Sequence, residues 1–483
     1  MLSQQHFLKL KQLVIVVFIA LIVLSPSIQI VPLDIFLHDA QRLVSLALLA
    51  VVLIYATLNT VSLGNSLLIS KSLRIAFYSL LALGVFSSAF SQYPRHAVLE
   101  VSIFASLCYV ALFTAELFFD NKQKFIKQFI YVLWASLLIY MFGVYVGYIV
   151  AFINITPMQW PQPMIGFTSI RSFNQYQLWS IGLITLPLLA FDIKQTSKRW
   201  LTIALTFWWA LLFYSASRGV LVAWFVGMIL TALVYKKLSW PFLKLQLVNI
   251  STGFVAYYVL FKLLPSMNQQ SVKLSTVIRD TTYDRIELWD ICYKMMETHS
   301  LLGVGPMHYY WYTRVGTHPH NSVLQLGAEW GIPATMIMLG IAAYGLYCWY
   351  KKFNVNNINL LPKLDCNLSI ILFFTIITNA AYSLVDGVIV MPISQVLMFT
   401  IIGIMIGQYQ HGLALGSGNH LTKRQFKFRP IFAGIVLIAL VWCNLPEIIQ
   451  GLSGNPRGFS SGPNIVNPRI WVQPGPRSWE NNS

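Results

Sequence analysis

The chain has 483 residues, of which 57% are hydrophobic and only 10% are charged. So few polar residues would not cover the surface of a soluble globular protein, which excludes that class and predicts that lipid surrounds most of the chain. The formal net charge of +17 would suggest nucleic-acid binding in a soluble protein, but in a membrane protein the charge has to be assigned loop by loop.

Apolar segments recur along the whole chain, and hydropathy predicts about 13 that are long enough to cross a bilayer. They lie at residues 13–31, 43–63, 75–91, 97–118, 128–153, 177–191, 200–216, 219–235, 246–264, 328–350, 367–385, 391–409 and 430–445. The first lacks a cleavage pattern of small residues and is followed by further spans, so it is expected to be a membrane helix and not a signal peptide. Short loops predict one bundle, an all-α integral membrane domain of about 12–13 transmembrane helices over residues 1–445.

The loop charges predict the orientation of this domain. With the N-terminus in the cytoplasm, the inner side receives 20 of the 33 basic residues but only four of the 16 acidic ones. Cytoplasmic loops are rich in lysine and arginine, so the net charge indicates topology, and no nucleic acid is expected as a partner.

The basic residues on the two sides differ in kind, since those inside are mostly lysine and those outside mostly arginine. One interpretation is that lysine orients the chain and leaves arginine outside by default. The other is that an outer site binds phosphate, because a guanidinium group is a planar fork that matches phosphate oxygens and stays charged.

Three outer segments are longer than the rest, and function is expected there: residues 154–176, residues 265–327 and a C-terminal tail, 446–483. The second contains an expected amphipathic helix, residues 284–297, with Ile286, Trp289, Tyr293 and Met296 at helical spacing, which predicts a helix on the membrane surface. The tail is rich in Gly, Pro, Asn and Ser and is expected to be an extended outer flap or partly disordered.

The densest polar cluster falls between residues 303 and 331. Turn residues precede it and an apolar helix follows, so His320 and Asn321 are expected at the outer mouth of a transmembrane helix. An imidazole there is able to accept a proton from a hydroxyl; the alternative is an interfacial residue that caps the helix or meets a lipid headgroup. His318, behind Pro319, is expected to be a loop or supporting residue.

Metal and nucleotide sites are not expected from this cluster. Histidines 299, 308, 318 and 320 lack both the i, i+4 helix spacing and the HExxH pattern of zinc sites. Gly303-Val304-Gly305 has no βαβ unit around it, so its glycines are expected to form a tight turn. The five cysteines have no paired spacing that would indicate a disulfide framework or zinc knuckle.

Charged residues at other outer helix ends are further candidates. Arg218 stands in a very short hinge and is expected either to face a polar cavity or to snorkel at the interface. Arg171 is likewise expected either to face a polar cavity or to snorkel at the interface, although Asn174 and Gln177 near it favour a polar pocket. Asp386, followed by Gly387, either orients a histidine or arginine or belongs to an ordinary turn.

Taken together, these residues resemble the O-antigen ligase family, with the related O-antigen polymerases and bacterial protein O-oligosaccharyltransferases. The family pattern is His, then Asn, Ser or Gln, nine residues, Gly, two residues, and Gly, Thr or Tyr. His320, Asn321 and Gly331 fit, whereas the last place is Ala334. The hinge at Arg218 and the stretch from Arg285 to the LLGVGP segment extend the resemblance.

The resemblance implies a GT-C-like membrane enzyme with a large periplasmic loop, in the inner membrane of a Gram-negative bacterium. It implies a metal-independent, inverting transfer, with no cofactor, of a glycan from undecaprenyl diphosphate to an acceptor hydroxyl in the periplasm. Roles follow for these residues: Arg171, Arg218 and Arg285 grip the diphosphate, His320 activates the hydroxyl, Asn321 and Asp386 support it, and Arg314 adds a phosphate or sugar contact.

The candidate transfer reactions share a donor and a mechanism and differ only in the acceptor. Ligation of O-antigen to lipid A core is the leading one, followed by glycosylation of a pilin or other exported protein and by repeat-unit polymerisation. A lipid flippase or transporter is a different class, but it should carry charges near the bilayer midplane, whereas here they gather at outer helix ends.

Overall fold

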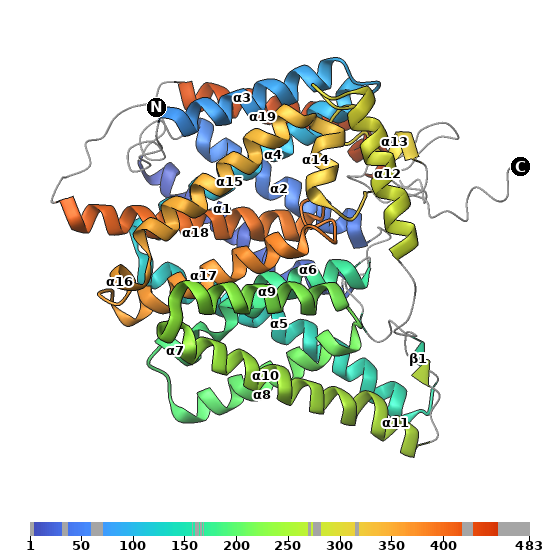
Figure 1. Ribbon diagram of the computed structural model, residues 1–483, viewed down its shortest axis with the longest axis vertical. Coiled ribbons are helices and arrows are strands. Elements are labelled where there is room, and N and C mark those ends of the chain that lie inside the picture. Colours follow the sequence, from blue (N-terminus) through green and yellow to red (C-terminus); the bar gives the residue numbers. More distant parts are fainter. Residues whose placement is uncertain are drawn as a thin grey trace, which may run out of the picture.

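The computed structural model describes residues 4–30, 37–58, 71–156, 158–159, 164, 167, 169–268, 272–273, 282–313, 318–417 and 428–452 (Figure 1). Within these ranges the chain is almost entirely helical, and the expected integral membrane helical bundle is confirmed. The helices of eighteen residues or more are α1 (Gln4–Leu24), α2 (Leu37–Leu58), α3 (Lys71–Ala89), α4 (Pro94–Asp120), α5 (Lys122–Ile153), α8 (Gln195–Tyr214), α9 (Arg218–Tyr235), α10 (Trp240–Tyr258), α15 (Ile332–Lys352), α17 (Lys363–Tyr382), α18 (Pro392–Ser417) and α19 (Phe428–Leu452).

Every predicted apolar segment overlaps a helix, but the described residues contain nine segments that are long and apolar enough to cross a membrane. The difference has local causes. One of the nine, Arg218–Met267, holds both α9 and α10, and α19 contributes only a shorter apolar stretch, Pro430–Pro446. The helix α8, which contains the predicted span at 200–216, is not among the nine.

The predicted span at residues 177–191 is a broken helix instead of a continuous one. It consists of α6 (Ile170–Ile181), the 3-10 turn η2 (Leu183–Thr185) and α7 (Leu186–Ala190). Side chains from other helices satisfy the carbonyls that the break frees: Asn379 Nδ2 donates to the Leu178 carbonyl at 3.4 Å, and Gln246 Nε2 donates to that of Ile181 at 3.3 Å. Inside a bilayer such a break requires these partners, because water is not there to replace them.

The expected helix is present as α12 (Thr282–Thr298), and the residues buried most deeply against protein are not the four that the sequence singled out. Leu288, Cys292 and Met295 are the buried residues, packed with residues of α13 (Tyr309–Thr313) and α14 (Ser322–Trp330), whereas Ile286 and Tyr293 are exposed. The helix therefore covers the end of the bundle through protein contacts (Figure 1). Its contact with a membrane surface stays a prediction.

The two long outer segments meet in a small parallel strand pair. Met158–Gln159 (β1) pairs with Val272–Lys273 (β2). These strands lie at the end of the bundle where α12 and α13 are found, and α16 (Val355–Ile358) lies at the opposite end (Figure 1). At the C-terminus, α19 continues to Leu452, past the predicted boundary at 445, and the rest of the tail lies outside the described residues.

Candidate active site

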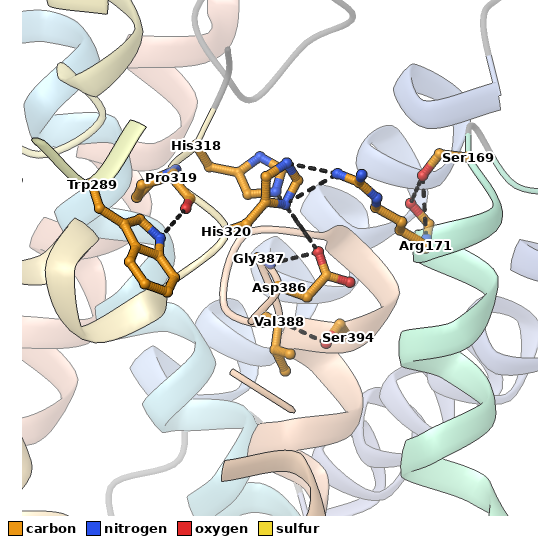
Figure 2. Close-up of polar contacts among 11 residues, drawn as sticks. Ser169, Arg171, Trp289, His318, Pro319, His320, Asp386, Gly387, Val388 and Ser394 are labelled. Carbon is orange, nitrogen blue, oxygen red and sulfur yellow. Dashed lines mark hydrogen bonds and ion pairs between the residues drawn. The ribbon is translucent and has the colours of Figure 1, made fainter. Parts of the chain in front are cut away.

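Four separate segments converge at the α12 end of the bundle. They are the start of α6, the start of α12, the turn before α14 and the loop between α17 and α18 (Figure 2). They carry Arg171, Arg285, His320 and Asp386 respectively. Two bonds fix the histidine turn among them: Ser322 N donates to the Ser383 carbonyl at 2.8 Å, and Trp289 Nε1 donates to the Pro319 carbonyl at 3.0 Å.

The LLGVGP segment and the end of α14 form a backbone clamp below this turn. Val304 N donates to the Ala328 carbonyl at 2.9 Å, and Ile332 N donates to that of Ser300 at 2.9 Å. Gly331 has a φ of +85°, and a Cβ there would lie 2.3 Å from the Leu301 carbonyl oxygen, so this position requires glycine. The expected tight turn is confirmed, since Gly303 and Gly305 also have positive φ.

His320 itself is held in a left-handed backbone conformation, with φ of +54°, which only a constrained turn maintains in a non-glycine residue. The next residue, Asn321, begins α14, and its Oδ1 accepts hydrogen bonds from Val323 N at 3.0 Å and Leu324 N at 3.1 Å. Asn321 thus uses its carbonyl oxygen as a helix cap, which leaves the amide nitrogen for any further contact.

The imidazole of His320 lies between Arg171 and Asp386 (Figure 2). Arg171 Nη1 is 2.7 Å from His320 Nε2, and His320 Nδ1 is 3.3 Å from Asp386 Oδ1. Arg171 Nη1 also lies 3.3 Å from His320 Nδ1. A guanidinium group only donates, so we assign the nearer nitrogen, Nε2, as the acceptor and place the proton on Nδ1, which faces Asp386. The side chain is 16% exposed, so this contact chain lies near the surface of the site.

The protonation states match this geometry. Burial lowers the pKa of His320 to about 4, and the nearby His318 and Arg171 act in the same direction against the opposing effect of Asp386. Burial alone would raise the pKa of Asp386, but the interactions with His318 and His320 hold it well below its usual range. At neutral pH the pair is therefore a neutral imidazole beside a carboxylate.

Arg285 belongs to the same site. Burial and the charge of Arg171 lower its pKa, whereas Asp386 raises it, which places all three groups within electrostatic reach. Its Nε is buried without a hydrogen-bond partner among the described residues. Two guanidinium groups with a single carboxylate beside them create an excess of positive charge.

Arg218 is the first residue of α9 and is exposed. Gly219 lies against the Tyr382 ring and Val385, a Cβ at Gly219 being 3.3 Å from both, and Tyr382 interacts with both Ser217 and Asp386. The hinge thus adjoins the loop that carries Asp386. Arg218 forms no ion pair with any residue that the structure describes.

The polar residues of α6 divide into different surroundings. Gln177 is fully buried and its Nε2 donates to the Trp208 carbonyl on α8 at 2.8 Å, so this side chain joins helices. Asn174 is also buried, and its Oδ1 has no partner among the described atoms. Gln175 is also buried, and neither its amide nitrogen nor its amide oxygen has a hydrogen-bond partner among the described atoms. The sequence analysis did not name it as a site residue.

His318 packs beside the catalytic candidate, with its ring centroid 4.2 Å from that of His320. Its Nε2 lies 3.9 Å from Asp386 Oδ1, and a Cβ on Gly387 would lie 2.3 Å from its ring, so the ring rests on glycine. His318, His320 and Asp386 each offer a ligand atom, all within 4.8 Å of one another, which is a possible metal site that the sequence spacing did not suggest. The positive charge of the Arg171 guanidinium, which contacts the same imidazole, disfavours a divalent cation there.

Arg314, the remaining predicted site residue, lies outside the described residues.

Comparison with known proteins supports the predicted family. Residues 201–339 match the family model described as O-Antigen ligase, a segment that contains Arg218, Arg285, His318 and His320. A search of the curated proteins found no match to the chain. The chain thus carries an O-antigen ligase family domain over residues 201–339, as its motif predicted, and is a multi-pass membrane protein.

Proposed function

We propose that the protein transfers a glycan from undecaprenyl diphosphate to an acceptor hydroxyl in the periplasm, and that the acceptor is lipid A core. The observation that carries this proposal is the contact chain of Arg171, His320 and Asp386, with Arg285 close by. It combines a neutral imidazole, which is able to take a proton, with cations that suit a diphosphate.

The reaction follows from these charges. The acceptor oxygen attacks the anomeric carbon of the glycan, its O–H proton passes to His320 Nε2, and the bond between the anomeric carbon and the diphosphate oxygen breaks. The new carbon–oxygen bond forms on the face opposite the leaving group, so the configuration inverts. The electron pair of the broken bond stays on the diphosphate, where Arg171, Arg285 and the exposed Arg218 stabilise the added negative charge.

Arg171 has two roles in this mechanism. In the unliganded protein it donates to Nε2, the nitrogen that must accept the proton. A diphosphate competes for the same guanidinium with charged oxygens, which are stronger acceptors than a neutral imidazole. Donor binding therefore draws Arg171 away from His320 and frees the base, which limits proton transfer to the loaded enzyme.

Asp386 orients the base. Its Oδ1 also accepts a hydrogen bond from Gly387 N at 2.8 Å, so the carboxylate is fixed before it meets His320 Nδ1. The negative charge stabilises the imidazolium that forms when the proton arrives, as in other carboxylate–histidine pairs.

The proposed transfer needs no metal ion, and chelation tests this point. Purified protein is assayed in EDTA with a synthetic undecaprenyl-diphosphate glycan and lipid A core, and the rate should equal that with added Mg²⁺. A rate that EDTA abolishes and a divalent cation restores would assign His318, His320 and Asp386 to metal binding instead.

The base is tested by His320→Ala in the same reconstituted assay. Loss of general-base catalysis should lower the rate by about 10²–10⁴-fold. His299→Ala is the matched control, because His299 is exposed and its Nδ1 lies 2.9 Å from the hydroxyl of the neighbouring Thr298. Full activity in His320→Ala at normal expression would remove this residue from the mechanism.

The acceptor is tested in a strain that lacks the gene. Loss of the lipopolysaccharide ladder, with core alone remaining, is expected for the proposed ligase. A full ladder together with a lower pilin mass would indicate a protein O-oligosaccharyltransferase, and a ladder reduced to single repeats would indicate a polymerase. A protein that moves the donor across vesicles without forming product would be a flippase.

A further inference from the structure

A buried arginine, Arg42, lies behind the site and belongs to none of the segments considered so far. Arg42 is on the second turn of α2 and is only 2% exposed. The sequence grouped it with the outer arginines, yet no role followed for it. A buried guanidinium is costly to desolvate, so its hydrogen bonds indicate what it holds in place.

Those bonds reach the loop that follows Asp386. Arg42 Nη2 donates to the Val390 carbonyl at 2.9 Å, and Nη1 donates to Gln395 Oε1 at 2.7 Å. Gln395 in turn donates from Nε2 to the Ile389 carbonyl at 2.8 Å. One guanidinium from the N-terminal part of the chain therefore joins the middle of the loop to the first turn of α18.

The remaining loop carbonyl is satisfied in the same region. Ser394 Oγ donates to the Val388 carbonyl at 2.6 Å (Figure 2). The same hydroxyl accepts from Trp179 Nε1 of α6 at 2.9 Å. The carbonyls of three successive residues, 388 to 390, are thus each held by a side chain. Side chains therefore hold the backbone along this stretch, and Asp386 with its bond to Gly387 N stands at the beginning of the loop.

We infer that Arg42 is a positioning residue for Asp386: it fixes the 386–395 loop so that the carboxylate meets His320 Nδ1. The geometry itself is independent of the reaction, and only the kinetic part of the test rests on the proposed function. A lysine cannot replace Arg42 fully, because one ammonium does not span both acceptors with the geometry of a planar fork.

The first measurement needs no activity. Purified protein is treated with diethyl pyrocarbonate at pH 7, and carbethoxylation of His320 is followed by peptide mass spectrometry. In the intact protein Arg171 covers Nε2 and Asp386 holds Nδ1, so modification is slow. Arg42→Met and Asp386→Asn should each accelerate it severalfold, and the double variant should react no faster than Asp386→Asn.

The matched control is Arg95→Met. Arg95 Nη1 also donates to a backbone carbonyl, that of Cys443 on α19, at 2.9 Å, but this bond joins α4 to α19 away from the 386–395 loop. Its loss should leave His320 modification unchanged. Arg42→Lys and Gln395→Met decide the question if Arg42→Met does not fold, because each removes part of the same link while keeping a side chain of similar size.

The second measurement is the transfer rate in a double-mutant cycle. Arg42→Met should lower kcat by about 10–100-fold with KM little changed, as loss of a residue that orients a catalytic group typically does. In the Asp386→Asn background the same substitution should have almost no further effect. The inference would be overturned if the reductions in kcat of the two single variants multiplied in the double variant. It would also be overturned if Arg42→Met left the rate of His320 modification at the wild-type value. Absence of transfer in the wild-type protein would reject the proposed function but leave the modification result decisive.

Discussion

The two ends of the bundle both contain charged residues, but they use them differently. At the α16 end, lysines pair with carboxylates of neighbouring helices: Lys11 Nζ is 3.0 Å from Glu116 Oε1, and Lys122 Nζ is 2.8 Å from Asp365 Oδ2. At the α12 end, Arg171, Arg218 and Arg285 form no ion pair with a carboxylate among the described residues. These two lysines at the α16 end are paired within the protein, whereas the three arginines at the α12 end have no carboxylate partner among the described residues.

This difference separates charges that stabilise the fold from charges that act on a ligand. Paired lysines and carboxylates join α1 to α4 and α5 to α17, and their removal should affect folding. Uncompensated arginines repel one another and gain their stabilisation when a phosphate arrives. Substitutions at the two ends should therefore change different measured quantities.

Among the charged residues at the two ends, the largest effect is expected for Arg285→Met or Arg218→Met. Each removes a cation that stabilises the departing diphosphate, so kcat/KM in the reconstituted assay should fall by about 10²-fold or more. Lys substitutions should remain impaired, because the bidentate fork is lost. Lys122→Arg at the opposite end is the control and should be active; wild-type turnover in Arg218→Lys would contradict the proposed role.

The pH dependence of transfer tests the state of His320. The imidazole must be neutral to accept a proton, so kcat/KM should hold from neutral pH down to about 4, the pKa of His320, and fall below it. Asp386 raises this pKa, so Asp386→Asn should move the acidic limb to lower pH while reducing the plateau. An acidic limb that keeps its midpoint in Asp386→Asn would mean that another group titrates.

A smaller effect is expected for Gly331→Ala in the clamp below the site. Its φ of +85° and the close Leu301 carbonyl oxygen both oppose a side chain. The strain should cost about 1–3 kcal/mol and lower the melting temperature. Gly340→Ala inside α15, the helix that follows Gly331, is the control and should melt like the wild type, because a Cβ there meets nothing within 4 Å.

The smallest effect on transfer is expected for Lys122→Met at the α16 end. It leaves the mostly buried Asp365 without its ion-pair partner, which should lower stability by about 1.5–3 kcal/mol, seen as a lower melting temperature. Turnover of the folded protein at low temperature should be unchanged. A large loss of turnover there would mean that the two ends are coupled.

The sequence predicted the helices and most of the candidate site because both leave local signals. Hydropathy marks each apolar helix, His320, Arg171 and Asp386 stand out as polar residues at the ends of predicted helices, and the family resemblance added Arg285. Which imidazole nitrogen faces which partner could not be predicted, since Arg171 lies 149 residues and Asp386 66 residues from His320.

Other features of the structure could not be predicted from the sequence, for the same reason. Gln177 reads as a pocket residue, yet its direction depends on where α6 breaks and on the Trp208 carbonyl of α8. The buried face of α12 depends on α14, and Arg42 reads as a loop charge until the 386–395 loop is folded against it. Contacts between distant segments decide these roles, and a single sequence does not contain them locally.

The break in α6 has an electrostatic consequence for the site. Because α6 starts at Ile170 and stops at Ile181, it is a short helix with Arg171 in its first turn. Aligned peptide dipoles give the N-terminal end of a helix a partial positive charge, and backbone amides supply it whatever the pH or side-chain rotamer. A phosphate would be attracted by this partial charge even while the Arg171 side chain still contacts the imidazole. The backbone at the start of α6 would therefore act first, and the Arg171 guanidinium would bind the phosphate afterwards.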